Sequence, residues 1–121
     1  MSEHTFVYVI AVRDGNELRS SIKVGISKSP QSRLAALRTG SPLDLVLVHQ
    51  FRLLSRAMAR DVEECFHATQ KTHHRQGEWF SISPDDAVLI LSLHIRWTLE
   101  GFTDLDEDER KAVLEFIGVP P

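Results

Sequence analysis

The chain has 121 residues, of which 42% are hydrophobic and 26% charged, with only 6 Gly and 5 Pro. This length supports one domain with a single hydrophobic core, and the composition excludes disordered and collagen-like proteins. The formal net charge of −3 hides an asymmetry, because residues 1–83 hold 11 Lys or Arg against 8 Asp or Glu, whereas residues 84–121 hold 3 against 9. The net positive charge of residues 1–83 is compatible with a polyanionic partner but does not require one.

The sequence contains no segment that predicts membrane insertion or secretion. The longest strongly apolar stretch, Ala87 to Leu99, is interrupted by three polar residues and falls short of the roughly 20 residues that a membrane span needs. Met1 to Thr5 lack the basic and long apolar regions of a secretory signal. The single cysteine, Cys65, cannot form an intrachain disulfide, which fits a reducing compartment. We therefore expect a cytoplasmic protein without a membrane partner.

Two apolar runs near the N-terminus predict a β-hairpin. Phe6 to Val12 are mostly β-branched or aromatic and indicate a buried strand. A turn at Asp14 to Asn16 leads to a second run, Ile22 to Ile26, which predicts a strand antiparallel to the first. Gly25 within this run indicates a position where another group approaches the backbone closely.

Capping residues predict the elements that follow. Ser29 followed by proline is typical of a helix start and Gly40 supplies the stop, so we expect a helix over residues 30–39 with its two leucines facing the core. Residues 43–51 resume an apolar, β-rich pattern and predict the third strand. Ser55 is expected to cap a second helix. Its apolar stripe consists of Met58, Val62, Cys65, Phe66 and Thr69.

The last third of the chain predicts one short strand and two helices. Residues 79–82 form a short extended segment. Ser83, followed by proline and two acids, predicts the start of a third helix that ends at Gly101. Because this helix is apolar on most sides, we expect it to be largely buried or to lie in an oligomer contact. Thr103 is expected to cap a last helix that runs to Ile117.

This order of elements predicts a small α/β domain of the α+β type. We expect a mainly antiparallel sheet of three to four strands, flanked by helices. Residues 1–83 would form the core of the domain, and residues 84–121 would form a C-terminal helical extension, two extra helices packed on the same domain.

Two groups of polar residues in the first two helices are candidates for chemistry. Arg33 follows the segment from Lys23 to Ser29, where a glycine and a helix start bring backbone N–H groups and basic side chains towards one point, a geometry that suits phosphate. The alternative interpretation is that these residues form a tight turn followed by a solvent-exposed arginine, with no phosphate site. Glu63 and His67 lie four apart and share one helix face, where the carboxylate can hold a divalent metal. A solvent-exposed Glu–His pair that binds no metal would have the same spacing, so this alternative stays open.

A third group surrounds Glu78, which follows a glycine turn between a basic loop and two large aromatic residues. Glu78 is either a second polar group of a site or a partner for Arg75. The histidines near Cys65 raise the alternative of a structural zinc site, although their spacing matches none of the usual zinc patterns. These histidines are His67, His73 and His74.

Five motifs follow one another in register between Phe6 and Ser83. In chain order they are Phe6-Val7-Tyr8, Lys23-Val24-Gly25, Arg33, the set of Ala57, Glu63 and His67, and Gly77-Glu78-Trp79-Phe80. Together they resemble the GIY-YIG nuclease superfamily, specifically its phage- and prokaryote-associated branch with a K-[IV]-G strand and a G-E-W-F ending. In the second motif the glycine is kept and the tyrosine is replaced by Lys23.

The resemblance implies a GIY-YIG-like fold and a metal-dependent endonuclease that hydrolyses nucleic-acid phosphodiesters, with DNA as the favoured substrate. Glu63 would bind Mg²⁺ (or Mn²⁺), Arg33 would neutralise the scissile phosphate, and Tyr8 would position or deprotonate the attacking water. His67 would orient the carboxylate or reach the leaving group. Lys23 would bind phosphate, act on the water, or mark an inactive site.

Further residues complete this hypothesis. Gly25 and Glu78 would support the site, and the nucleic-acid surface would consist of Lys28, Arg38, Lys71 and Arg75. The alternative is a catalytically inactive module that binds nucleic acid through the basic surface, or a protein through the acidic C-terminal helices. A homodimer is expected if residues 87–97 leave an apolar face uncovered in the monomer.

Overall fold

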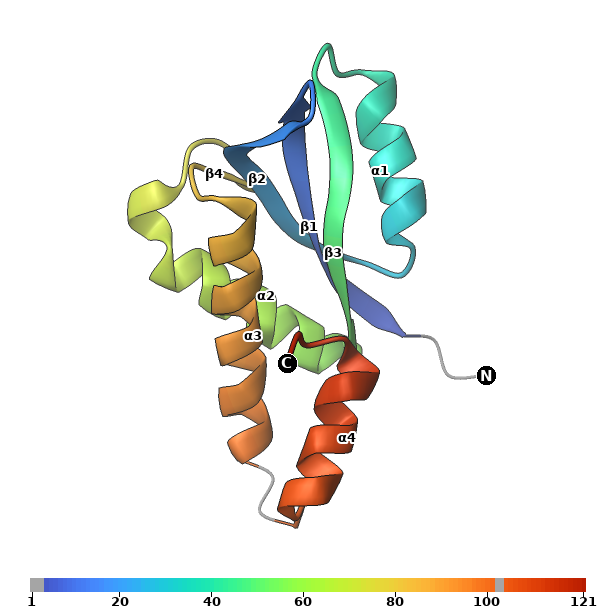
Figure 1. Ribbon diagram of the computed structural model, residues 1–121, viewed down its shortest axis with the longest axis vertical. Helices are drawn as coiled ribbons and strands as arrows, with labels where there is room; N and C mark the ends of the chain where they lie inside the picture. Colours follow the sequence, from blue (N-terminus) through green and yellow to red (C-terminus); the bar gives the residue numbers. More distant parts are fainter. Residues whose placement is uncertain (1–3, 102–103) are drawn as a thin grey trace.

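The computed structural model describes residues 4–101 and 104–121 of the chain. In chain order, its elements are β1 (Thr5–Asp14), β2 (Glu17–Ser27), α1 (Pro30–Thr39), β3 (Asp44–Leu53), α2 (Arg56–Thr69), a 3₁₀ turn η1 (Lys71–His73), β4 (Trp79–Phe80), α3 (Pro84–Glu100) and α4 (Glu107–Ile117). The strands form one antiparallel sheet in the order β3-β1-β2-β4. The predicted α+β class is therefore confirmed (Figure 1).

Strand β1 is one of the two inner strands of the sheet and lies between two apolar layers. Its alternating side chains place Val7 and Val9 on the face that α2 and α3 cover, and Tyr8 and Ile10 on the face that α1 covers (Figure 1). All four side chains are at most 1% exposed. A strand buried on both faces reads as a continuous apolar run, which is why β1 was predictable from its sequence.

Serine caps fix the starts of α1, α2 and α3 as predicted. The side-chain oxygens of Ser29, Ser55 and Ser83 each accept a hydrogen bond from the backbone N–H three residues further along the chain. The bounds predicted for α1 are those observed. Strand β2, by contrast, begins at Glu17 and not at Ile22, because its first residues are exposed and polar and carry no apolar signal.

The predicted start of the last helix was wrong. The helix begins at Glu107, and its N-cap is Asp106, which forms a reciprocal capping box with Glu109. This pair satisfies two backbone N–H groups at once, and the acids that follow favour the positive end of the helix dipole. Thr103, the cap that we expected, lies outside the described residues.

Helix α3 is buried on one side only. Ala87, Leu91, Ile95 and Leu99 are fully buried in the same core cluster as the sheet. The opposite side faces solvent, so the helix is not largely buried in the monomer, and the alternative expectation, an oligomer contact, stays a prediction. In the described parts of the chain, every helix is too short or too polar to cross a membrane.

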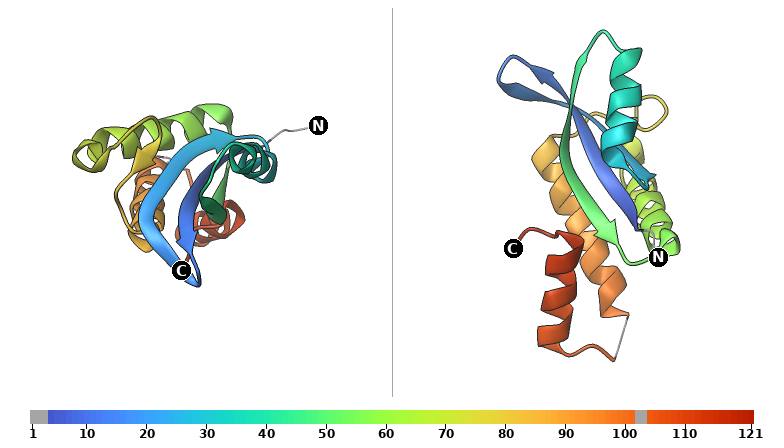
Figure 2. Two further views of the ribbon diagram at one scale, coloured as in Figure 1. Left: turned by 90° about the horizontal axis from the view of Figure 1, so that it is seen from above. Right: turned by 90° about the vertical axis from the view of Figure 1, so that its right-hand side faces the viewer.

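The C-terminal residues return from α4 to the sheet and to α3 (Figure 2). The Nε2 of His49 on β3 donates a hydrogen bond to the carbonyl oxygen of Gly118, at 2.7 Å. Gly118 adopts a φ of +97°, which an L-residue rarely does, and this conformation ends α4 and turns the chain. Arg96 of α3 then donates to the carbonyl oxygen of Pro120 at 3.3 Å.

Phe66→Ala is expected to lower the free energy of unfolding by about 3–5 kcal/mol, because it opens a cavity in the core. Phe66 is fully buried on α2, and its ring meets the ring of Phe80 edge to face with 5.1 Å between centroids. Urea unfolding measures the loss. Phe116→Ala on α4 is the matched control: Phe116 is 47% exposed, so a much smaller loss is expected. Equal losses in the two variants would contradict this account of the core.

Candidate active site at the edge of the sheet

The candidate site lies where β4 stops covering β2. Strand β4 pairs with only Ile22 and Lys23 of β2, so Val24, which pairs with Val9 of β1 on one side, has no partner in β4 on the other side. Its N–H donates to the carbonyl oxygen of Glu78 at 3.3 Å, and its carbonyl oxygen lies 3.2 Å from Nε2 of His67. Because a carbonyl only accepts, Nε2 of His67 is the donor. Helix α2 therefore reaches the edge of the sheet through His67.

Glu78 enters the site from the connection before β4. Its Oε1 lies 2.9 Å from Nζ of Lys23, whose side chain is only 9% exposed. The ammonium of Lys23 also lies 5.8 Å from the ring centroid of Trp79. A charge this well buried requires a counter-charge, and Glu78 supplies it. The partner of Glu78 is thus Lys23, and not Arg75 as one reading of the sequence suggested.

Gly25 is required by the close approach of two side chains. It pairs with Tyr8 across β1 and β2. A Cβ at this position would overlap the Tyr8 hydroxyl and would lie 2.9 Å from Oε2 of Glu78. The prediction that another group approaches the backbone at Gly25 is confirmed, and the approaching groups are themselves candidate site residues.

Arg33 on α1 and Tyr8 on β1 form a guanidinium–phenol pair on the α1 face of the sheet. Burial raises the pKa of Tyr8, and the hydrogen bond from Arg33 opposes that rise. The negative charges of Glu78 and Glu63 raise the pKa of Tyr8 further. The same hydrogen bond raises the pKa of Arg33. Tyr8 is therefore a neutral phenol at neutral pH.

Glu63 on α2 faces the same group of side chains. Burial raises the pKa of the Glu63 carboxyl, and the nearby charge of His67 opposes that rise. Glu78 raises the pKa of Glu63 again, both through its charge and through a side-chain hydrogen bond between the two carboxyl groups. Two carboxylates that share one site repel each other unless a proton or a cation lies between them.

Five predicted site residues from five segments therefore converge. Tyr8 contacts Arg33, Lys23 contacts Glu78, and Glu78 contacts Glu63. Their catalytic roles stay predictions.

The predicted nucleic-acid residues are more dispersed. Lys28 is exposed directly before α1, and Lys71 and Arg75 are exposed on the connection that leads to Glu78. Arg38 lies at the far end of α1, where its Nε donates to the carbonyl oxygen of Leu45 at 2.9 Å. Arg38 thus also has a structural role, fastening the end of α1 to β3.

The donor set fits a magnesium-type ion better than structural zinc. Within residues 4–101 and 104–121, no group of three or more His, Cys, Asp or Glu side chains is arranged to hold a metal. Cys65 instead lies 3.5 Å from Nδ1 of His94 on α3, and His67 is bound to β2. Glu63 and Glu78 offer adjacent carboxylates, and Mg²⁺ is typically held by one or two carboxylates together with waters and substrate phosphates.

Sequence reasoning missed two components of the site. Trp79 was not named as a site residue, yet its ring, which packs against the buried cluster on the α1 face, also lies beside the buried ammonium of Lys23. The backbone of Val24 binds both His67 and Glu78, although no side-chain pattern marks it. The only signal for either was that Glu78 and Trp79 are neighbours in the chain.

The fold and the site together define a small α+β domain with a charged, half-buried site at one sheet edge. The T5orf172 domain model matches residues 5–95, so the chain belongs to the T5orf172 domain family. The expected membership of the GIY-YIG superfamily was wrong, since the family that matches is a different one. No curated protein and no solved structure matches the chain.

The resemblance to GIY-YIG proteins misled for a physical reason. Its motifs sample few positions, and the fold itself requires several of them: Gly25 makes room for Tyr8, and Glu78 neutralises Lys23. The match to the T5orf172 domain instead runs continuously from β1 into α3, beyond Ser83, where the motif pattern ended.

A spectroscopic titration tests this geometry, because Tyr8 is the only tyrosine in the chain. Its phenolate absorbance should appear above the ordinary pKa of 10.0. Arg33→Ala should raise the pKa of Tyr8 further, whereas Glu78→Gln should lower it. Arg38→Ala, on the same helix but bound to Leu45, should leave it unchanged. Shifts in the same direction for Arg33→Ala and Glu78→Gln would show that these groups do not surround Tyr8.

Proposed function

We propose that this protein is a metal-dependent endonuclease that hydrolyses nucleic-acid phosphodiesters, with DNA as the first substrate to test. The observation that carries the proposal is the pair of adjacent carboxyl groups, Glu63 and Glu78, close to the Arg33–Tyr8 pair. Phosphodiester hydrolysis requires charge neutralisation and a positioned nucleophile more than covalent chemistry. This group of side chains offers both.

Glu63 would hold the metal, with Glu78 beside it. Burial and the nearby second acid disfavour the charged form of Glu63 and so raise its pKa. A divalent cation would stabilise this charged form. A bound Mg²⁺ or Mn²⁺ would polarise a phosphate oxygen and lower the pKa of a bound water. The ammonium of Lys23, 2.9 Å from Oε1 of Glu78, would hold that carboxyl group in place, which is a positioning role.

Arg33 and Tyr8 would act on the phosphate directly. The Arg33 side chain is exposed, and a guanidinium has five N–H donors, so the bond to Tyr8 leaves others for a phosphate oxygen. Tyr8 keeps its proton at neutral pH and accepts from Arg33. Its own O–H can then donate to a water or phosphate oxygen, so it positions the nucleophile in preference to deprotonating it.

The basic side chains around the site would bind the nucleic-acid backbone. Lys28 lies between Lys23 and Arg33 in the chain, and Lys71 and Arg75 lie on the connection to Glu78, so exposed positive charges are close in sequence to several candidate residues. The proposal includes a cytoplasmic location, where a reducing environment keeps the thiol of Cys65 free.

Cleavage assays with purified protein test the enzyme proposal. Wild type should nick or cleave DNA in Mg²⁺ or Mn²⁺, and Glu63→Gln should abolish cleavage because it removes the metal's anchor. Arg33→Ala should reduce the rate by about 10²- to 10³-fold, the usual effect of losing one donor to a developing oxyanion. Glu64→Gln, an exposed neighbour on the same helix, should retain near wild-type activity.

Binding assays separate the enzyme from the alternative, a binding module without catalysis. Both hypotheses predict that Arg33→Ala weakens DNA binding and lowers its salt dependence by about one phosphate contact. Only the enzyme cleaves. Wild-type protein that binds DNA but leaves single-stranded, double-stranded and branched substrates intact in both metals would refute the enzyme proposal, and Lys23 would be the first residue to examine.

Thermal unfolding tests the state of Glu63 without any activity assay. Because its folded-state pKa is raised above 4.5, Glu63 contributes most to stability below that pH, and the contribution is lost as pH rises through the folded-state pKa. Glu63→Gln mimics the protonated form, so it should raise the melting temperature at neutral pH but not below pH 4.5.

The same experiment reports on the metal. Adding Mn²⁺ should raise the melting temperature of wild type and of Glu64→Gln, because a ligand that binds only the folded state stabilises it. Glu63→Gln should show no such rise. An equal metal response in all three proteins would place the metal elsewhere.

A further inference from the structure

The outer side of α3 carries an exposed apolar stripe. Leu89, Leu93 and Trp97 are 57%, 42% and 61% exposed and lie four residues apart, so they line one side of the helix. In an isolated monomer this row of large apolar side chains would remain in water, and such patches mark contact surfaces.

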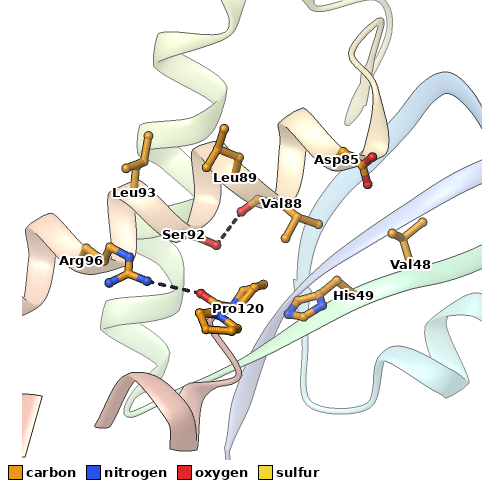
Figure 3. A pocket seen from close by; sticks show the side chains of 10 residues that line it. Val48, His49, Asp85, Val88, Leu89, Ser92, Leu93, Arg96 and Pro120 are labelled. Carbon is orange, nitrogen blue, oxygen red and sulfur yellow. Dashed lines mark hydrogen bonds between the residues drawn. The ribbon is translucent and has the colours of Figure 1, made fainter. Parts of the chain in front are cut away.

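Charged residues border the stripe on both sides. A cavity of about 460 Å³ on one side is lined by Asp85 and Arg96 together with Leu89 and Leu93 (Figure 3). A cavity of about 400 Å³ on the other side is lined by Asp86 together with Leu89. Helical geometry puts Asp85 and Arg96 on one border of the stripe, and Asp86 and Trp97 on the other.

We propose that α3 packs antiparallel against α3 of a second copy of this chain, with Leu89 opposite the partner subunit's Leu93. The borders of the stripe indicate this partner, because they carry Asp85 and Asp86 near the start of α3 and Arg96 towards its end. In the antiparallel register, Asp85 meets the partner subunit's Arg96 on one border, and Asp86 meets the indole N–H of the partner subunit's Trp97 on the other. The two-fold axis repeats each contact.

The opposite orientation is disfavoured by the same charges. Two parallel α3 helices would place Asp85 and Asp86 against the same acids of the partner subunit, at helix ends whose dipoles also repel. Antiparallel helices bring the positive end of each dipole to the negative end of the other. The charge pattern therefore selects a second copy in one orientation.

The proposed dimer is small and leaves the candidate site open. Helix α3 has 17 residues, so one helix pair is about 25 Å long and lies at the low end of specific interfaces. We expect a dissociation constant on the order of micromolar. Tyr8 and Arg33 lie on the α1 face of the sheet, whereas α3 covers the other face (Figure 1), so pairing through the outer side of α3 leaves these two residues uncovered.

Sedimentation velocity over a range of concentrations tests the stripe. Wild type should dimerise, and Leu93→Glu should weaken dimerisation at least about tenfold, because it places two like charges near the axis. Leu54→Glu is the matched control, since Leu54 is 48% exposed on the connection between β3 and α2. Monomeric wild type at the highest concentration, or a dimer that Leu93→Glu leaves intact, would overturn the proposal.

A charge exchange tests the orientation. Arg96→Asp alone and Asp85→Arg alone should each weaken the dimer, because each places like charges opposite one another. The combined variant should recover most of the wild-type affinity. It also lacks the bond from Arg96 to Pro120, so recovery cannot arise from the C-terminal residues. Failure of the combined variant to recover would overturn the antiparallel register.

Discussion

The unpaired edge of β2 at Val24 is the constraint on which the candidate site depends. Backbone N–H and C=O groups beside a buried core need partners, and β4 is too short to supply them here. Glu78 and His67 take the place of strand residues. These two hydrogen bonds also position neighbouring side chains. The carboxylate of Glu78 lies in the site, and Glu63, one helical turn before His67 on α2, faces that carboxylate.

The two acids of the site have different surroundings. Glu78 has the buried ammonium of Lys23 as an ion-pair partner, whereas Glu63 is half-buried beside a second acid, and burial together with that acid raises its pKa. An arrangement of this kind reduces the stability of the folded protein at neutral pH, and such arrangements cluster at functional sites. Burial raises the pKa of Tyr8, and the charges of both acids raise it further, so the phenol stays neutral.

Local features of this chain were predictable from its sequence and non-local ones were not. The serine caps and the stop at Gly40 depend on residues within one turn, so the bounds of α1 were correct. Gly25 was recognised as a point of close approach, but Tyr8 and Glu78 come from other strands, and only pairing reveals them. The start of β2 was missed because its exposed residues carry no apolar periodicity.

Helix α3 links the packed core to the exposed stripe, because its inner and outer sides have different surroundings. Its inner side carries Ala87, Leu91 and Ile95 into the core beneath the sheet, and the match to the T5orf172 domain ends at residue 95, within this helix. The helix thus belongs to the same packed unit as the strands that hold the candidate site. Burial of the inner side fixes which residues the outer side presents, because residues four apart in a helix share a face. The requirement for a closed core therefore leaves the exposed stripe with its charged borders on the outer side of α3, and in the proposed dimer a second copy of the stripe would contact both its apolar and its charged groups.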